Sequence, residues 1–185
     1  SAFSDGVIAI IITIMILEIK APVGNHFSDL YKILPSILSY MMSFGFVGIY
    51  WNNHHHLLQA STCVNGKILW ANLLLLFCLS WIPFATIWMG GHYASPDPVA
   101  FYGFVLLCTG ISYYILVQTL VRYHEKDTVV VQAIGRDLKG RISVILYTFA
   151  IGFAYVYVRI SYLLFVIVSV MWLVPDKRIE KKMSV

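Results

Sequence analysis

Charged residues are scarce in this chain. Only 12% of its 185 residues are Asp, Glu, Lys or Arg, whereas a soluble domain is roughly a quarter charged. Hydrophobic residues make up 59% of the sequence, and the mean hydropathy is +0.78. The apolar residues stand in long blocks, each close to the ~20 residues that cross a ~30 Å hydrocarbon core. The composition therefore excludes a soluble fold and predicts a single all-α integral membrane domain over residues 1–185.

Cysteine is rare as well. The chain has three cysteines, Cys63, Cys78 and Cys108, and their spacing fits neither a disulfide framework nor a metal site. Two of them lie inside apolar segments, where a thiol behaves as a small hydrophobic group. We therefore expect no metal site and no cofactor.

Several functional signatures are also missing. The sequence has no TVGYG-type carbonyl filter, no Arg-rich voltage sensor and no Gly-rich phosphate loop. No ladder of acidic residues runs through the predicted membrane centre, which argues against a proton pump. No nucleophile and base share a membrane depth, so we do not expect an enzyme. The first apolar segment lacks the basic leader and the small-residue cleavage site of a signal peptide.

Six apolar segments divide the chain. They cover about residues 3–19, 33–53, 68–89, 99–121, 142–158 and 162–174. Turn and breaker residues separate several of them, such as Pro22, Gly90-Gly91 and the run Ser95 to Pro98. Pro83 lies within the third segment and predicts a kink there. The pattern predicts six transmembrane helices.

The positions of Lys and Arg predict the orientation. The flanks on one side carry only Lys20, Lys32 and Arg159. The flanks on the other side carry ten basic residues: Lys67, Arg122, Lys126, Arg136, Lys139, Arg141, Lys177, Arg178, Lys181 and Lys182. Basic residues accumulate on the cytoplasmic side, and the chain crosses an even number of times. Both termini are therefore expected in the cytoplasm.

The start of the first helix is polar. Ser4 or Asp5 can cap this helix, and a carboxylate suits the positive end of its dipole. A plain helix start at the membrane interface is therefore one interpretation. An ionisable residue near membrane depth is also a functional candidate, usually with a partner elsewhere in the bundle.

One face of the first helix is aliphatic. Ile10, Thr13 or Ile14, and Leu17 follow one another at spacings that place them on a single helical face. Such a stripe commonly packs in a core or contacts lipid. It can also line a pore, where a ring of Ile or Leu side chains forms a constriction that gates by dewetting. The periodicity alone leaves these uses open.

A second polar cluster ends the second segment, with the sequence Trp51-Asn52-Asn53-His54-His55-His56. Consecutive residues on a helix point about 100° apart, so three adjacent histidines cannot all ligate one ion. A hydrogen bond from this cluster to the start of the first helix is the better interpretation, because both lie at the same depth. Such bonds contribute only ~1 kcal/mol each in membranes, but they would set the angle of the first helix.

The run Phe3-Ser4-Asp5 before an Ile-rich helix resembles the transmembrane protein 175 family of potassium channels, in its bacterial single-repeat form. The signature of that family is Arg, three residues and then Phe-Ser-Asp, so its Arg would precede Ser1. The six-segment layout is similar to the family's, as are the residues that end the second segment: Trp51, His54 and His55.

The resemblance implies a homotetramer in which four first helices line a central pore for potassium. It places the constriction and selectivity on hydrophobic residues of that helix, which by offset from Asp5 are Ile10, Ile14 and Leu17, with Thr13 as a polar layer. It also implies a multi-pass protein of the bacterial plasma membrane, with K+ and lipid as partners and no nucleic acid. The residues that it implies to position the pore helix are Phe3, Ser4, Asp5, Trp51, His54 and His55.

Two other functions remain open at this stage. A small secondary transporter would show a broken helix and an internal repeat around a polar site at the midplane. A membrane scaffold without transport activity would use the stripe of the first helix for packing only. If the chain is a channel, a ring of aliphatic side chains cannot replace the hydration shell of an ion. We then expect modest selectivity for potassium over sodium.

Overall fold

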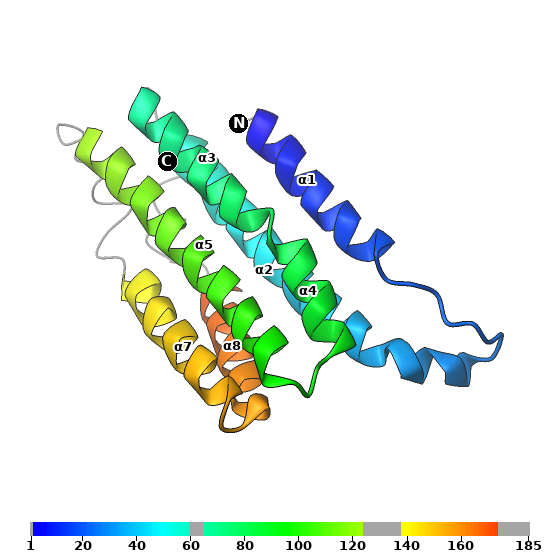
Figure 1. The fold of residues 1–185 in the computed structure, drawn as a ribbon. Helices are drawn as coiled ribbons and strands as arrows, with labels where there is room; N and C mark the ends of the chain where they lie inside the picture. The colour runs from blue at the N-terminus through cyan, green and yellow to red at the C-terminus, as the bar shows by residue number, and fades with distance from the viewer. Residues whose placement is uncertain (1, 60–64, 124–137, 174–185) are drawn as a thin grey trace.

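The computed structural model describes residues 2–59, 65–123 and 138–173 (Figure 1). These residues are helical apart from short connections. The elements are α1 (Ala2–Leu17), η1 (Phe27–Ile33, a 3-10 helix), α2 (Leu34–Gln59), α3 (Gly66–Leu79), α4 (Ile82–Gly91), α5 (Pro96–Tyr123), α7 (Leu138–Ala154) and α8 (Val158–Leu173). The all-α fold expected from the sequence is confirmed.

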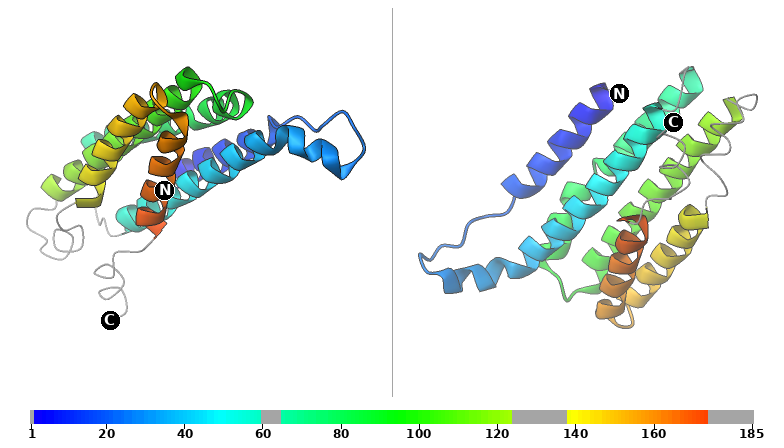
Figure 2. Two further views of the ribbon diagram at one scale, coloured as in Figure 1. Left: turned by 90° about the horizontal axis from the view of Figure 1, so that it is seen from below. Right: turned by 180° about the vertical axis from the view of Figure 1, so that it is seen from behind.

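The helices lie side by side and alternate in direction (Figures 1 and 2). Helix α4 continues the path of α3, so the described residues cross the bundle six times, in agreement with the six expected helices. Helix α1 lies at one edge, in contact with α2, α3 and α4, whereas α7 and α8 pack against α5 on the other side. This arrangement leaves one side of α1 without a neighbour among the described residues.

The helix ends differ from the edges of the apolar segments. Helix α2 runs to Gln59 rather than to about residue 53, so the Trp–His cluster lies within the helix. Helix α7 begins at Leu138 and α8 at Val158, each about four residues before the expected segment. Polar residues continue these helices because intrahelical hydrogen bonds do not require an apolar side chain. Cys63 and the basic residues in 124–137 and 174–185 lie outside the described residues.

The third segment is interrupted rather than merely kinked. Helix α3 ends at Leu79 and α4 begins at Ile82, with Pro83 as its second residue. Proline suits the first turn of a helix because its missing N–H would have no partner there. The Ser80 hydroxyl donates to the Phe77 carbonyl at 2.7 Å, and the Ser80 N–H donates to the Leu76 carbonyl at 3.0 Å. These bonds satisfy backbone groups that the break exposes.

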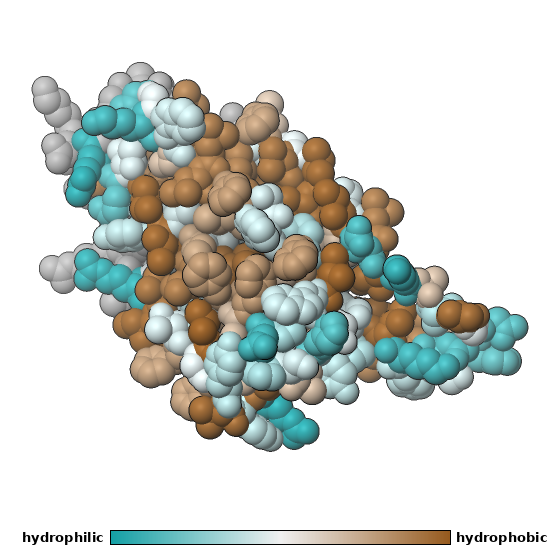
Figure 3. Space-filling model, in the orientation of Figure 1, coloured by the Kyte–Doolittle hydropathy of each residue, from teal (hydrophilic) through white to brown (hydrophobic). Residues whose placement is uncertain are grey.

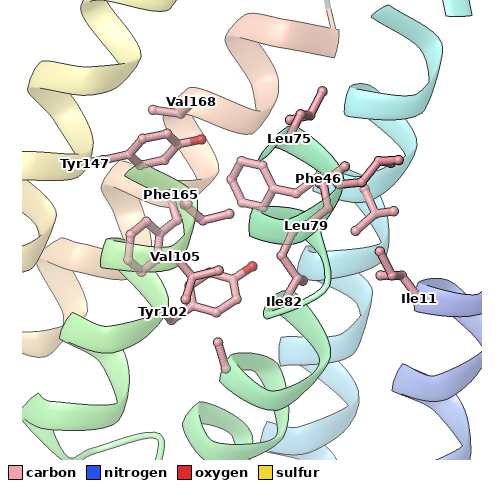
Figure 4. Packing of buried hydrophobic residues seen from close by; sticks show 14 of the residues in the cluster. Ile11, Phe46, Leu75, Leu79, Ile82, Tyr102, Val105, Tyr147, Phe165 and Val168 are labelled. Carbon is pink, nitrogen blue, oxygen red and sulfur yellow. The ribbon is translucent and has the colours of Figure 1, made fainter. Parts of the chain in front are cut away.

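The core is continuous across the bundle. Side chains from every crossing meet in it, and Figure 4 shows those of Ile11, Phe46, Leu75, Leu79, Ile82, Tyr102, Val105, Tyr147, Phe165 and Val168. A polar layer lies within this core. Thr86 donates a hydrogen bond to the Ser43 hydroxyl at 2.7 Å, and the Ser43 and Tyr102 hydroxyls are 2.9 Å apart. Each buried hydroxyl thus has a partner, as interiors require.

The outer surface is apolar over a broad band. Figure 3 shows hydrophobic residues over the middle of one face and most hydrophilic residues towards its ends. Among the described residues, three helical stretches are long and apolar enough to cross a membrane, and α1 and α8 are shorter apolar helices. The three are Phe27–Gln59, Gly66–Gly91 and Pro96–Arg122. Soluble monomers rarely expose apolar surface on this scale. The chain is therefore a multi-pass membrane protein.

Candidate functional site

Helix α1 has two chemically similar faces with opposite surroundings. Its buried face packs against α2, α3 and α4 and consists of Ser4, Ile8, Ile11 and Met15. The spacings of four, three and four residues keep these side chains on one side of the helix. On the other side Ile10 is 57% exposed and Leu17 is 81% exposed.

The exposed face contains all four residues predicted to line a pore. Ile10, Thr13, Ile14 and Leu17 are exposed along the length of α1. The Thr13 hydroxyl donates to the Ile10 carbonyl at 2.9 Å, so its proton is used within the helix while its oxygen can still accept. The face therefore offers an aliphatic stripe with one acceptor.

The polar start of α1 is tied to α2. The indole Nε1 of Trp51 donates to Oδ1 of Asp5 at 3.0 Å. Asp5 lies in the first turn of α1, where the helix dipole favours a carboxylate. A hydrogen bond to an ionised carboxylate is stronger than one between neutral groups. The bond therefore fixes the end of α1 against the second crossing, as the sequence led us to expect.

A second link runs through α3. Nε2 of His54 lies 2.7 Å from Oδ1 of Asn72, and the Asn72 amide donates to the Ser4 hydroxyl at 3.0 Å. Because the Asn72 oxygen accepts, His54 carries its proton on Nε2. Its Nδ1 is buried and has no hydrogen-bond partner among the described residues. Ser4, Asn72 and His54 thus join the first three crossings near one end of the bundle.

The remaining predicted residues lie elsewhere. Gln59 donates to Nε2 of His55 at 2.8 Å, and the His55 ring lies 5.5 Å from that of Trp51, so His55 contacts Trp51 rather than α1. Phe3 is 67% exposed and lies on the same face of α1 as Ile10. The structure therefore brings Ser4, Asp5, Trp51 and His54 together and leaves Phe3 and His55 outside these hydrogen bonds.

Asn72 was missed by the reasoning from sequence. It is a single amide in the apolar run from Ala71 to Leu79, and the run was interpreted by its hydropathy alone. A polar side chain within a membrane helix usually bonds to another helix, which was the available signal. Its position in the middle of the network makes it the residue that connects α1 to α2 through α3.

The described residues contain no group of three His, Cys, Asp or Glu side chains placed to hold a metal ion. The cluster around His54 consists of hydrogen bonds between helices. These hydrogen bonds attach one end of α1 to α2 and α3, and an aliphatic stripe runs along the exposed face of α1.

Comparisons with known proteins agree on one family. The family described as "Endosomal/lysosomal potassium channel TMEM175" matches residues 1–83, which include both polar clusters. A potassium channel of Chryseobacterium sp. (strain P1-3) is 48% identical over 183 residues, which are 99% of this chain and 95% of that protein. A potassium channel of Streptomyces collinus is 33% identical over 129 residues, or 65% of this chain and 63% of its own.

A solved structure gives the same result. The crystal structure of a lysosomal potassium-selective channel TMEM175 homolog from Chamaesiphon minutus matches with a TM-score of 0.77 and 26% identity. The match covers 92% of this chain and 93% of that one. Sequence and fold therefore agree over nearly the whole chain: it belongs to the TMEM175 family of potassium channels and, as a channel, is not an enzyme.

Proposed function

We propose that four copies of the chain surround a central pore, that the exposed face of α1 lines it, and that potassium passes a constriction made by Ile10, Ile14 and Leu17. The observation that carries this proposal is the aliphatic stripe on the free face of a helix at the edge of the bundle. One helix cannot enclose a pore, so the subunit must assemble, and closed rotational symmetry is the usual solution.

The chemistry of the stripe determines what it does to ions. Rings of Ile and Leu side chains exclude water and gate by dewetting, and they offer no ligands to replace a hydration shell. The Thr13 oxygen, which can still accept a hydrogen bond, would form the polar layer among them. We expect potassium to be preferred over sodium only modestly, compared with a filter of backbone carbonyls. Bi-ionic reversal potentials measure this preference directly.

The polar network has a structural role in this proposal. The Trp51–Asp5 bond and the Ser4–Asn72–His54 chain hold one end of the pore helix in angle and rotation. We place that end and both termini in the cytoplasm of a bacterial cell, with the protein in the plasma membrane. Lys67 and Arg122 support this orientation, since α3 begins and α5 ends at the same end of the bundle as the start of α1. The channel needs no cofactor besides the permeant K+.

One observation favours the transporter alternative. The break between α3 and α4 gives the chain an interrupted helix, which transporters use to build substrate sites at the midplane. Here, however, Ser80 and Trp81 at the break are exposed rather than turned into a shared cavity. The interruption is therefore a poor candidate for a substrate site.

Potassium flux in liposomes tests the proposal. The purified parent chain is compared with Ile10→Asn and Leu17→Ala on the stripe, and with Ile16→Ala, which is also exposed but about a third of a turn away. We expect the two stripe variants to increase the flux severalfold or to lower its selectivity, and Ile16→Ala to match the parent. Saturable uptake would favour a transporter. A folded, oligomeric parent without flux would favour a scaffold and overturn the proposal.

A further inference from the structure

A hollow lies at the end of the bundle opposite the start of α1. Residues of the α4–α5 and α7–α8 connections line it, it is open to the surroundings, and its volume is about 520 Å³. Its lining is rich in tyrosine: Tyr93, Tyr155, Tyr157 and Tyr162. The Tyr162 hydroxyl donates to the Tyr93 carbonyl at 3.1 Å and so joins the two connections. Tyrosine is typical of the membrane interface.

Arg159 is the charged residue in this lining. Its guanidinium carbon lies 5.9 Å from the centre of the Tyr157 ring, close enough for a cation–π contact that orients the side chain. Among the described residues, the salt bridge present is the one between Lys32 and Asp29. Arg159 therefore forms no salt bridge with a described carboxylate. Its N–H donors are free to bind an anion.

The start of α5 carries an acid, and it interacts with one of the lining tyrosines. Asp97, at the start of α5, accepts a hydrogen bond from Tyr155, and this bond raises the pKa of the Tyr155 hydroxyl. Asp97 is not part of the lining of the hollow. The hydroxyls of Tyr162 and Tyr155 are thus used as donors within the protein, and the group that the hollow presents to an anion is the guanidinium of Arg159.

We propose that this hollow binds the phosphate headgroup of an anionic phospholipid, such as phosphatidylglycerol. The planar guanidinium of Arg159 matches two phosphate oxygens, a geometry that an ammonium does not provide. Val156 and Tyr93 at the hollow are strongly exposed and give apolar surface to the glycerol and the upper acyl chains. Free phosphate would gain nothing from these apolar groups, so the lipid is the favoured ligand. The proposal depends on the membrane setting and not on the path of the pore.

Native mass spectrometry of the detergent-purified protein tests the site. Equal amounts of phosphatidylglycerol and phosphatidylcholine are offered to the parent chain, to Arg159→Gln, to Arg159→Lys and to Lys20→Gln. Lys20 is a matched control because it is basic and exposed and follows the end of α1, whereas the start of α1 lies at the opposite end of the bundle. We expect the parent to retain phosphatidylglycerol preferentially. Arg159→Gln should bind it on the order of tenfold more weakly, Arg159→Lys should be intermediate, and Lys20→Gln should match the parent.

Competition with inorganic phosphate distinguishes a site for a lipid headgroup from a site for free phosphate. The lipid site predicts that millimolar phosphate fails to displace phosphatidylglycerol. Displacement would identify an anion site without a lipid component and overturn the proposal. Equal retention of both lipids would also overturn the proposal. Equal losses of bound phosphatidylglycerol from Arg159→Gln and Lys20→Gln would do the same, because they would indicate attraction to general surface charge. Melting temperatures without added lipid check that each variant is folded.

Discussion

The two faces of α1 differ in burial although both are rich in isoleucine. Ile8 and Ile11 are 1% and 3% exposed, whereas Ile10 and Ile14 are 57% and 41% exposed. Residue type cannot explain the difference. The cause is the packing of α2, α3 and α4, which cover one side of the helix only. None of the described residues covers this aliphatic face, so we expect it to meet lipid or another copy, and the predictions below separate those outcomes.

The largest effect should come from a polar group on the buried face. Ile11→Asn places an amide without hydrogen-bond partners in a packed core. It should lower the free energy of unfolding by about 3 kcal/mol or more, which is enough to reduce the yield of folded protein. Ile10→Asn on the exposed face should leave the folded yield close to that of the parent. The recovery of monodisperse protein from detergent measures both. Equal losses of folded yield from Ile11→Asn and Ile10→Asn would show that the two faces of α1 are equally buried.

A cavity on the buried face should have the next largest effect. Met15 is fully buried, so Met15→Ala should cost ~2–4 kcal/mol of stability. Leu17→Ala removes a similar volume from the exposed end of the same helix and should change the stability of the subunit little. Thermal unfolding in detergent compares the two variants. A similar drop in melting temperature for Leu17→Ala would mean that the Leu17 side chain is packed within an assembly. Cross-linking of the oligomer would then test that packing.

The Asn72 network should contribute less. Asn72→Leu leaves the Ser4 hydroxyl and Nε2 of His54 without their partner and should cost ~1–2 kcal/mol. The effect of Ser4→Ala should be much smaller in that background than in the parent, because the two residues share one hydrogen bond. A double-mutant cycle on thermal unfolding measures this coupling. Additive losses would show that the bond contributes nothing to the attachment of α1.

Gly6→Ala should have the smallest effect on stability and the most informative sign. A Cβ at Gly6 meets no atom within 4 Å, so helix propensity predicts a gain of about 0.5–1 kcal/mol. Gly6 lies four residues before Ile10, so if that face lines the pore, the added methyl should also reduce the potassium flux. Gly152→Ala in α7 is the matched control, because a Cβ there is equally free.

Gly152→Ala should stabilise the protein and leave the flux unchanged. If both alanine variants leave the flux unchanged, the Gly6 side of α1 does not narrow the ion path. A loss of stability at Gly6 alone would instead show that a neighbouring copy approaches the glycine closely.

The sequence predicted the fold well because hydropathy is the dominant signal in a membrane. Long apolar runs gave the number of crossings, and Pro83 indicated the disturbance in the third segment. The helix ends were less predictable, since α2 continues to Gln59 through polar residues that need no burial. The size of the break at Ser80–Trp81 was also missed, because it depends on local hydrogen bonds rather than on composition.

The site was predictable in part. Depth in the membrane placed Asp5 and Trp51 together, and the structure contains their hydrogen bond. Periodicity grouped Ile10 with Leu17, but it could not show which face of α1 is covered, because that depends on three other helices. Asn72 was overlooked because a single amide hardly changes the mean hydropathy of its segment. Which helices pack against one another depends on tertiary contacts, and a single sequence predicts these contacts poorly.

Cysteine accessibility along α1 tests the central claim most directly, namely that the exposed face lines the ion path. Ile14→Cys, Leu17→Cys and Ile16→Cys are introduced into a background in which the native cysteines are replaced by alanine. A charged methanethiosulfonate reagent is then applied during current recording. The account predicts rapid block at positions 14 and 17 and little change at position 16. Unchanged currents at positions 14 and 17, or block as fast at position 16, would contradict it.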